Sequence, residues 1–208
     1  MGELADRLDA LVVSARSPDG RVEAVVGDRG TTVSVSFQPG VYRRYGETAL
    51  AHQLEQMARL AWTRYARDVS ETIDFYYARA DGDFRTHGEG VTDTPERRRY
   101  LQELAEIVVE ASSPEEHVSL RTHALASWKV TIAAGALGRL SEGQFLDELH
   151  AAVETLLARY RFRMLRIRDD IYGLGIPRHP AAEATTSTPT PATREVVRVG
   201  LQLRRSER

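Results

Sequence analysis

The sequence predicts an α+β protein made of two tandem α-β-β(-β)-α units that pack on each other as an intramolecular pseudo-dimer, followed by a disordered C-terminal tail. Three observations lead to this prediction. Residues 17–40 have the pattern of a β-hairpin, a long segment after them has helical periodicity, and both patterns return about 95 residues later. The 208 residues leave room for one large or two small domains.

Residues 17–40 are expected to form a hairpin of two strands. The apolar run at 22–26 follows a Pro-Asp-Gly turn, and residues 32–37 alternate between polar and apolar side chains, as in a strand with one buried face. Between the two runs, Gly27-Asp28-Arg29-Gly30 has glycine where a positive φ costs little. Because so short a strand pair is not stable alone in water, it needs apolar cover.

Helices on both sides of the hairpin are expected to supply that cover. Residues 3–13 place Leu4, Leu8, Leu11 and Val12 on one helical face, with a strand over residues 12–16 as the alternative for the end of this segment. Residues 47–77 contain neither proline nor glycine, and their apolar periodicity predicts a helix of about 45 Å. Since this helix is longer than the small sheet, its far half is expected to pack on another helix, as in a coiled coil.

The same order of elements returns in the second half of the chain. Residues 79–94 are rich in glycine and acidic side chains and are interpreted as a linker, after which Thr94-Pro95-Glu96 has the signature of a helix start. Tyr100, Leu104, Ile107 and Val108 then repeat the pattern of Leu4, Leu8, Leu11 and Val12. Ser113-Pro114 follows Ser17-Pro18 by 96 residues, whereas later matches follow by 95, which places a one-residue deletion in the second hairpin turn. The matches at 95 include Gly40 with Gly135, Arg44 with Arg139, Glu47 with Glu142, Leu54 with Leu149, and Arg64-Tyr65 with Arg159-Tyr160.

The units are therefore placed at residues 1–78 and 95–173, joined by the linker at 79–94 and followed by the tail at 174–208. Each unit is too small to bury a full core comfortably, and each long helix has an apolar seam that needs a partner. Packing the units on each other meets both needs, as in a homodimer with a two-fold axis. Two independent domains are the alternative.

Composition excludes several classes of site. The chain has no cysteine, so disulfides, thiolate nucleophiles and cysteine-based zinc sites cannot occur. The six histidines lack metal-ligand spacing and no glycine-rich phosphate loop is present, so no enzyme activity, cofactor, metal ion or small-molecule substrate is expected. No run approaches the roughly 20 apolar residues of a membrane span, and the acidic, amphipathic N-terminus favours a cytoplasmic protein. The net charge of -2 gives no general attraction for nucleic acid.

The order of elements in the first copy resembles the YbaB/EbfC family of small nucleoid-associated proteins. This order is a helix, the run S-P-D-G-x-V-x-x-x-V at residues 17–26, a glycine turn, an alternating strand that ends near Pro39-Gly40, and a long helix. The first copy fits from Leu4 to about Ile73. The second departs from the pattern, because Glu115-Glu116 replaces Asp19-Gly20 and residues 122–126 contain no glycine. The resemblance implies units that dimerise through sheet and helices, and a bacterial protein of the nucleoid that binds double-stranded DNA with little sequence preference.

The candidate DNA-binding residues are arginines of the second unit. In the segment RYRFRMLRIR, three arginines fall on one flank of the helical seam and two on the other, and a second group lies in the first turn of a helix, where the helix dipole disfavours cations. Two interpretations stay open: a phosphate-contacting face, or solvated arginines paired with acidic neighbours such as Glu154 and Asp169. The candidates are Arg159, Arg161, Arg163, Arg166 and Arg168, with Arg97, Arg98 and Arg99.

Phe162 and Leu165 point away from the seam, which indicates a contact with the first unit, with a protein partner or with a further copy of the chain.

The tail is rich in proline, threonine and alanine and ends in a basic, alternating segment, so it is expected to be a disordered tether. The alternative to DNA binding is a fused pseudo-dimer that acts as a protein-interaction or accessory module, for example in a secretion apparatus.

Overall fold

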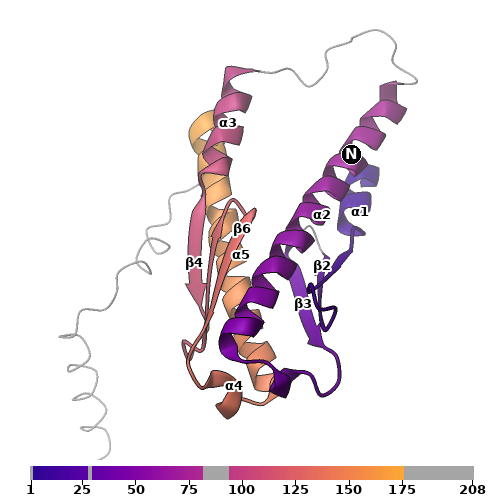
Figure 1. The fold of residues 1–208 in the computed structure, drawn as a ribbon. Helices are drawn as coiled ribbons and strands as arrows, with labels where there is room; N and C mark the ends of the chain where they lie inside the picture. Colours follow the sequence, from indigo (N-terminus) through magenta and orange to yellow (C-terminus); the bar gives the residue numbers. More distant parts are fainter. Residues whose placement is uncertain (1, 28–29, 82–93, 176–208) are drawn as a thin grey trace, which may run out of the picture. The chain divides into compact units, whose positions relative to one another are not determined.

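The computed structural model describes residues 2–27, 30–81 and 94–175. The first repeat begins with helix α1 (Gly2–Asp9) and continues with strands β1 (Val13–Arg16), β2 (Val22–Gly27) and β3 (Thr32–Phe37). A short 3-10 helix, η2 (Tyr42–Arg44), then leads to the long helix α2 (Glu47–Asp81) (Figure 1). Three segments lie outside the described residues. They are most of the expected linker (82–93), the expected disordered tail from 176 onward, and residues 28 and 29 of the hairpin turn.

The second repeat has the same order of elements. Helix α3 (Pro95–Ala105) precedes strands β4 (Val108–Ser112), β5 (Val118–His123) and β6 (Ser127–Ile132), and the short helix α4 (Ala136–Arg139) leads to α5 (Glu142–Tyr172). The expected start of α3 is confirmed, because the Thr94 side chain accepts a hydrogen bond from the Arg97 N–H and Pro95 follows it. The α+β class and the internal duplication are thus confirmed.

Each repeat has a three-stranded antiparallel sheet, in the orders β1-β2-β3 and β4-β5-β6, so the third strand that the sequence left open is present in both. The registers agree: Val13 lies opposite Val26, and Val109 lies opposite Thr122 in the equivalent place. Four residues connect β2 to β3, whereas three connect β5 to β6. The deletion predicted from the change of shift therefore lies in this turn.

The first turn of each sheet is closed by a buried serine. The Ser17 hydroxyl accepts a hydrogen bond from the Val22 N–H at 3.0 Å, and the Ser113 hydroxyl accepts one from the Val118 N–H at 3.1 Å. In this turn of the first repeat, Gly20 has a φ of 72°. In the same turn of the second repeat, Glu116 takes the left-handed conformation, with a φ of 59°. The Ser-Pro match in the sequence therefore marks the same turn twice, with a strained residue in the second copy.

One hydrophobic core joins the two repeats. Helix α2 contacts β6 of the second sheet as well as β1 and β2 of its own, and α5 contacts β3 of the first sheet as well as β4 and β5 of its own (Figure 1). The indole rings of Trp62 on α2 and Trp128 on β6 stack with centroids 6.3 Å apart. The expected pseudo-dimer is therefore built by reciprocal packing of each long helix on the other repeat. The side chains of the two long helices that are buried in this shared core are Leu50, Ala51, Leu54, Met57 and Ala61 of α2, with Phe145, Leu149, Ala152, Leu156 and Leu157 of α5.

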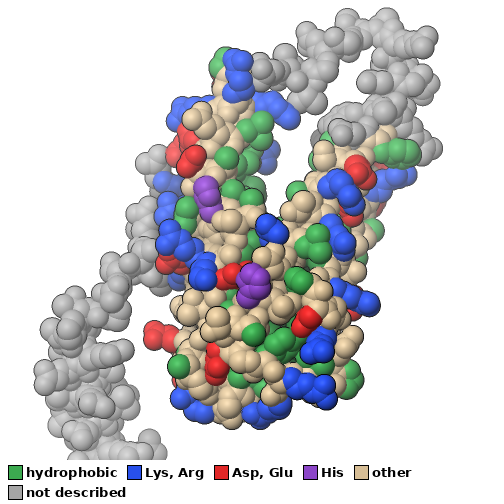
Figure 2. Space-filling view, viewed as in Figure 1, with side chains coloured by type: hydrophobic (Ala, Val, Ile, Leu, Met, Phe, Trp, Pro, Cys, Tyr) green, Lys and Arg blue, Asp and Glu red, His purple; other side chains and the backbone are tan. Residues whose placement is uncertain are grey.

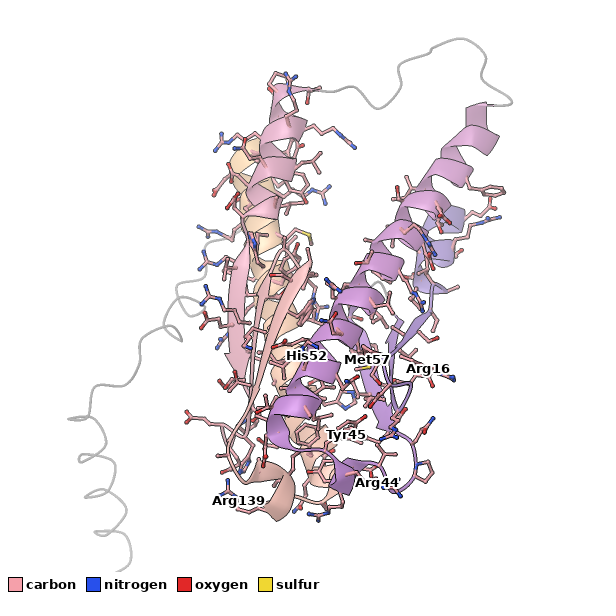
Figure 3. All side chains as sticks on the ribbon, viewed as in Figure 1. Arg16, Arg44, Tyr45, His52, Met57 and Arg139 are labelled. Carbon is pink, nitrogen blue, oxygen red and sulfur yellow. The ribbon has the colours of Figure 1, made fainter. Side chains whose placement is uncertain are left out.

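Polar contacts also join the repeats where the long helices begin. A guanidinium nitrogen of Arg43 donates to the carbonyl oxygen of Leu137 at 2.9 Å, and the Gly135 N–H donates to the Glu47 carboxylate at 3.0 Å. The stick view shows Arg44 and Tyr45 in the connection between β3 and α2, and Arg139 in the equivalent connection of the second repeat (Figure 3). These bonds fix the starts of α2 and α5 relative to each other.

Two details differ from the sequence expectation. The first helix ends at Asp9 and β1 begins at Val13, so strand alternation buries Val13 and leaves Val12 65% exposed; Val108 is likewise exposed at the start of β4. Helix α2 continues to Asp81, past its expected end, and the helix that its far half contacts is the short α1 of its own repeat. The second long helix is not its partner there, because both long helices are used to cover sheets.

Candidate nucleic-acid interface

The candidate arginines of the second unit lie on the C-terminal half of α5. This helix begins with a capping box formed by Ser141 and Gln144, which satisfies N–H groups of its first turn. Tyr160, Met164 and Ile167 pack against the core, as the seam pattern predicted. The arginines at the intervening positions are thereby placed on the two flanks of the seam.

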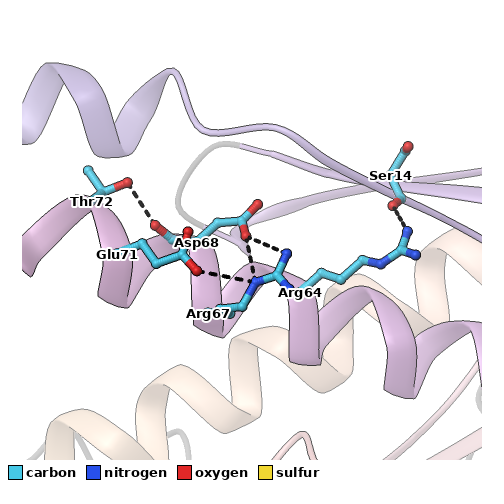
Figure 4. A network of polar contacts seen from close by, with 6 residues as sticks. All are labelled: Ser14, Arg64, Arg67, Asp68, Glu71 and Thr72. Atoms are coloured by element: carbon cyan, nitrogen blue, oxygen red, sulfur yellow. Dashed lines mark hydrogen bonds and ion pairs between the residues drawn. The ribbon is translucent and has the colours of Figure 1, made fainter. Parts of the chain in front are cut away.

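Two of these arginines are engaged within the chain. An Nη1 atom of Arg159 donates to the carbonyl oxygen of Glu110 on β4, and Nε of Arg161 donates to the carbonyl of Leu157 one turn earlier at 3.2 Å. Arg64, which matches Arg159 in the first repeat, donates to the Ser14 carbonyl on β1 at 3.0 Å (Figure 4). Because both repeats contain this bond, it ties each long helix to an edge strand of its own sheet.

Arg163 and Arg166 have no such engagement. Neither guanidinium forms a hydrogen bond or ion pair with another residue in the part of the chain that the structure describes. Arg163 is exposed and Arg166 is half-buried. Their charges are therefore available to an external anion.

Helix α3 packs on α5 beside the remaining candidates. The rings of Tyr100 and Tyr172 meet edge to face with centroids 5.9 Å apart. Burial raises the pKa of Tyr100, and the positive charge of Arg168 nearby offsets part of that effect. The structure thus brings Arg168 next to α3, whereas Arg159 lies toward β4.

The three arginines at the start of α3 differ in their contacts. Nε of Arg99 pairs with the Glu103 carboxylate at 2.7 Å, and Arg98 also interacts within the chain. The Arg97 side chain has no hydrogen bond or ion pair with any other described residue. Figure 2 shows Lys and Arg side chains gathered around this end of α3. Arg168 of α5 likewise forms no hydrogen bond or ion pair with another described residue. Arg97 and Arg168 therefore join Arg163 and Arg166 as the candidates whose charge is uncompensated.

The two repeats differ in charge at equivalent positions of their long helices. At the shift of 95, Arg163 and Arg166 of α5 correspond to Asp68 and Glu71 of α2. Both carboxylates lie near Arg67, with N–O distances of 3.4 and 3.5 Å (Figure 4). This reversal of charge was not predicted, although it can be read from the same matches between residues 95 positions apart that indicate the duplication.

Apolar side chains are exposed next to the arginines. Phe162 is 39% and Leu165 43% exposed, in agreement with their expected outward direction. Leu101 of α3, at 51%, and Tyr172, at 45%, are exposed as well and were not foreseen. The face formed by α3 and the end of α5 is thus both basic and partly apolar.

Among the described residues, no group of three or more His, Asp or Glu side chains is arranged to hold a metal ion. None of the described helices combines the length and the apolar character that a membrane span requires.

The fold and this face define a duplicated α+β protein with an arginine-rich helical surface on its second repeat. No protein-family model, curated protein or solved structure matches the chain. The resemblance to the YbaB/EbfC family therefore stays a prediction from the sequence.

Proposed function

We propose that this protein binds double-stranded DNA with little sequence preference through the arginines of α3 and α5, as a non-enzymatic nucleoid-associated protein. The observation that carries the proposal is that Arg163 and Arg166 are uncompensated within the described chain. Around them, α3 and residues 159–170 contain eight arginines and four acidic residues, although the whole chain has a net charge of -2. Binding of this kind depends on local charge rather than on the total.

The physical basis is the release of counterions from the DNA backbone. Each arginine that neutralises a phosphate frees a condensed cation, so affinity falls steeply as salt concentration rises. A guanidinium that already bonds a backbone carbonyl, as in Arg159 and Arg161, must give up that bond to contact a phosphate. The largest contribution is therefore assigned to Arg163 and Arg166, followed by those of Arg97 and Arg168.

The test is binding of a fluorescent random-sequence duplex, measured by anisotropy over a range of salt concentrations. Replacing Arg163 and Arg166 by glutamine keeps helix propensity, and is expected to weaken binding for all sequences alike and to lower the salt slope by up to about two. The matched control is R16Q/R121Q, which removes two exposed arginines that pair with Glu23 and Glu110. An R163Q/R166Q slope equal to that of the control would place the DNA contact elsewhere, and absence of wild-type binding at low salt would overturn the proposal.

A second candidate function is a protein-interaction or accessory module without DNA binding, for example in a secretion apparatus. The exposed Phe162 and Leu165 on the outer side of α5 favour it, because adjacent exposed apolar side chains mark contact surfaces. The same titration separates the two functions, since this candidate requires that the duplex is not bound even at low salt.

A further inference from the structure

We propose that the chain also associates with itself, by docking the acidic groove between α1 and α2 of one copy onto the basic, apolar end of α5 of a second copy. This inference goes beyond DNA binding and does not depend on it. Its basis is a pair of complementary surfaces at equivalent places in the two repeats.

The first surface is an open groove of about 480 Å³ between α1 and α2. Leu11 and Phe75 give it apolar walls, and Phe75 is 56% exposed although the Arg7 guanidinium lies over its ring. Asp68 and Glu71 line the groove with two carboxylates, against the single guanidinium of Arg7. The groove thus combines apolar contact area with negative charge.

The charge around this groove is acidic overall. Helix α1 and residues 64–73 contain five acidic residues and three arginines, whereas α3 and the equivalent residues 159–168 contain eight arginines and two acidic residues. The two repeats of one chain therefore present opposite local charge. Opposite surface potentials favour encounter and fix the orientation of two partners.

The second surface has the side chains that this groove would accept. At the shift of 95, the set Arg67, Asp68 and Glu71 becomes Phe162, Arg163 and Arg166. The first set neutralises itself partly, through Arg67. The second set cannot do so, because a phenyl ring replaces the residue of opposite charge. An exposed ring next to two uncompensated arginines on the same helix thus matches a groove with apolar walls and two carboxylates.

Docking in this way replaces the exposed ion pairs of Arg67 by ion pairs that are buried between the two copies. In the free chain Arg67, Asp68 and Glu71 have side chains that are 67%, 37% and 69% exposed, and ion pairs so exposed stabilise little. Bringing Arg163 and Arg166 to the carboxylates, with Phe162 against Leu11 and Phe75, would compensate both charge sets and cover the apolar rings.

The occupant is a second copy because the two surfaces do not satisfy each other within one chain. Among the described residues, no ion pair joins α2 to α5. An acidic groove on one copy and a basic helix end on the next form a heterologous contact, which leaves one surface of each kind free at the ends of the assembly. The expected product is therefore a series of oligomers that grows with concentration.

The test is sedimentation velocity of the full chain without DNA, over a range of protein concentrations at low and moderate salt. The wild type is expected to form oligomers that grow with concentration and dissociate as salt is added. The variants D68N/E71Q and R163Q/R166Q each remove one surface and are expected to weaken association about tenfold or more. An equimolar mixture of the two retains one complementary pair of surfaces and is expected to stop at a one-to-one complex.

The control variant is E23Q/E110Q, which removes two carboxylates on the sheets that pair with Arg16 and Arg121, and it is expected to associate like the wild type. Circular dichroism verifies that all variants are folded. A wild type that stays monomeric at low salt, or variants that associate as the wild type does, would overturn the proposal. Since D68N/E71Q leaves the arginines of α5 intact, it is expected to retain DNA binding, so self-association and the proposed function can fail separately.

Discussion

The Glu55 carboxylate on α2 accepts a hydrogen bond of 3.0 Å from the backbone N–H of Val130 on β6, and so joins the long helix of one repeat to the outermost strand of the other. His150, at the equivalent position of α5, contacts the carbonyl oxygen of Val33 on β3. Because β3 and β6 are sheet edges, these contacts occupy backbone groups that could otherwise pair with another chain. Arg64 and Arg159 bond carbonyl groups on the opposite edges, β1 and β4.

Replacing Glu55 by alanine is expected to lower the free energy of unfolding by about 1–3 kcal/mol, because the half-buried Val130 N–H would lose its acceptor. Glu55→Gln should cost less, since an amide oxygen still accepts the bond and the charge pairings that are lost are those with the exposed side chains of Lys129 and His52. Urea denaturation measures both values. Glu71→Ala, an exposed position on the same helix, is the control, and equal losses for Glu55→Ala and this control would contradict the prediction.

Replacing Glu116 by glycine is expected to stabilise the protein by about 0.5–1 kcal/mol. Glu116 has a φ of 59°, a conformation that costs a residue with a Cβ about 1–2 kcal/mol, and glycine occupies the equivalent position 20 at 72°. Part of the gain is offset by the greater freedom of glycine in the unfolded chain. Thermal denaturation tests the sign. Glu115→Gly is the control, because residue 115 needs no positive φ, and an equal gain there would contradict the argument.

The duplication and the strands were predictable because they are local or repeated patterns. Alternation at residues 32–37 defines β3, and the change of shift from 96 to 95 located the shorter turn before β6. The boundary between α1 and β1 was harder to predict from the sequence. Leu11 and Val12 fit both a helical face and a strand, and only the pairing of Val13 with Val26 decides which side is buried.

The candidate site was predictable as a set but not residue by residue. The arginines are visible in the segment 159–168, yet the bond between Arg159 and Glu110 joins residues 49 positions apart and depends on how α5 lies on β4. The packing of each long helix on the sheet of the other repeat could likewise not be predicted in detail. Glu55 and His150 occupy equivalent positions but meet an N–H in one repeat and a carbonyl in the other, so no shared motif announces the contact.

Tyr45 is expected to make stability depend on pH at the alkaline end. Burial, and then a hydrogen bond that its hydroxyl donates to Asp19, raise its pKa from 10.0 to about 12. The folded state thus favours the neutral phenol, so this contribution to stability is complete below pH 10 and is lost as the pH rises toward about 12. The melting temperature should fall over that interval.

Tyr45→Phe isolates this contribution, because its melting temperature is expected to fall less than that of the wild type between pH 10 and about 12. Asp19 is expected to make stability depend on pH at the acid end, where stability falls as the pH is lowered. Burial alone would raise its pKa, but hydrogen bonds from the Ser17 and Tyr45 hydroxyls and the Arg21 N–H hold it below 3.8, so its contribution is lost as the pH falls below that value. Tyr172→Phe, at an exposed position, is the control. Parallel curves for Tyr45→Phe and the wild type would contradict the assignment.

The two tryptophans provide an optical test of the packing between the repeats. Trp62 belongs to the first repeat and Trp128 to the second, and their rings lie nearly parallel, with an interplanar angle of 12°. Two indoles this close couple their transitions, so the folded protein is expected to show an exciton couplet in its circular dichroism spectrum. Trp62→Phe and Trp128→Phe should each abolish the couplet completely, because a single indole has no partner, and both should lower the melting temperature since each ring packs against the shared core. Tyr65→Phe, beside Trp62, is the control that retains both indoles. A couplet that survives in either tryptophan variant would mean that the signal arises elsewhere.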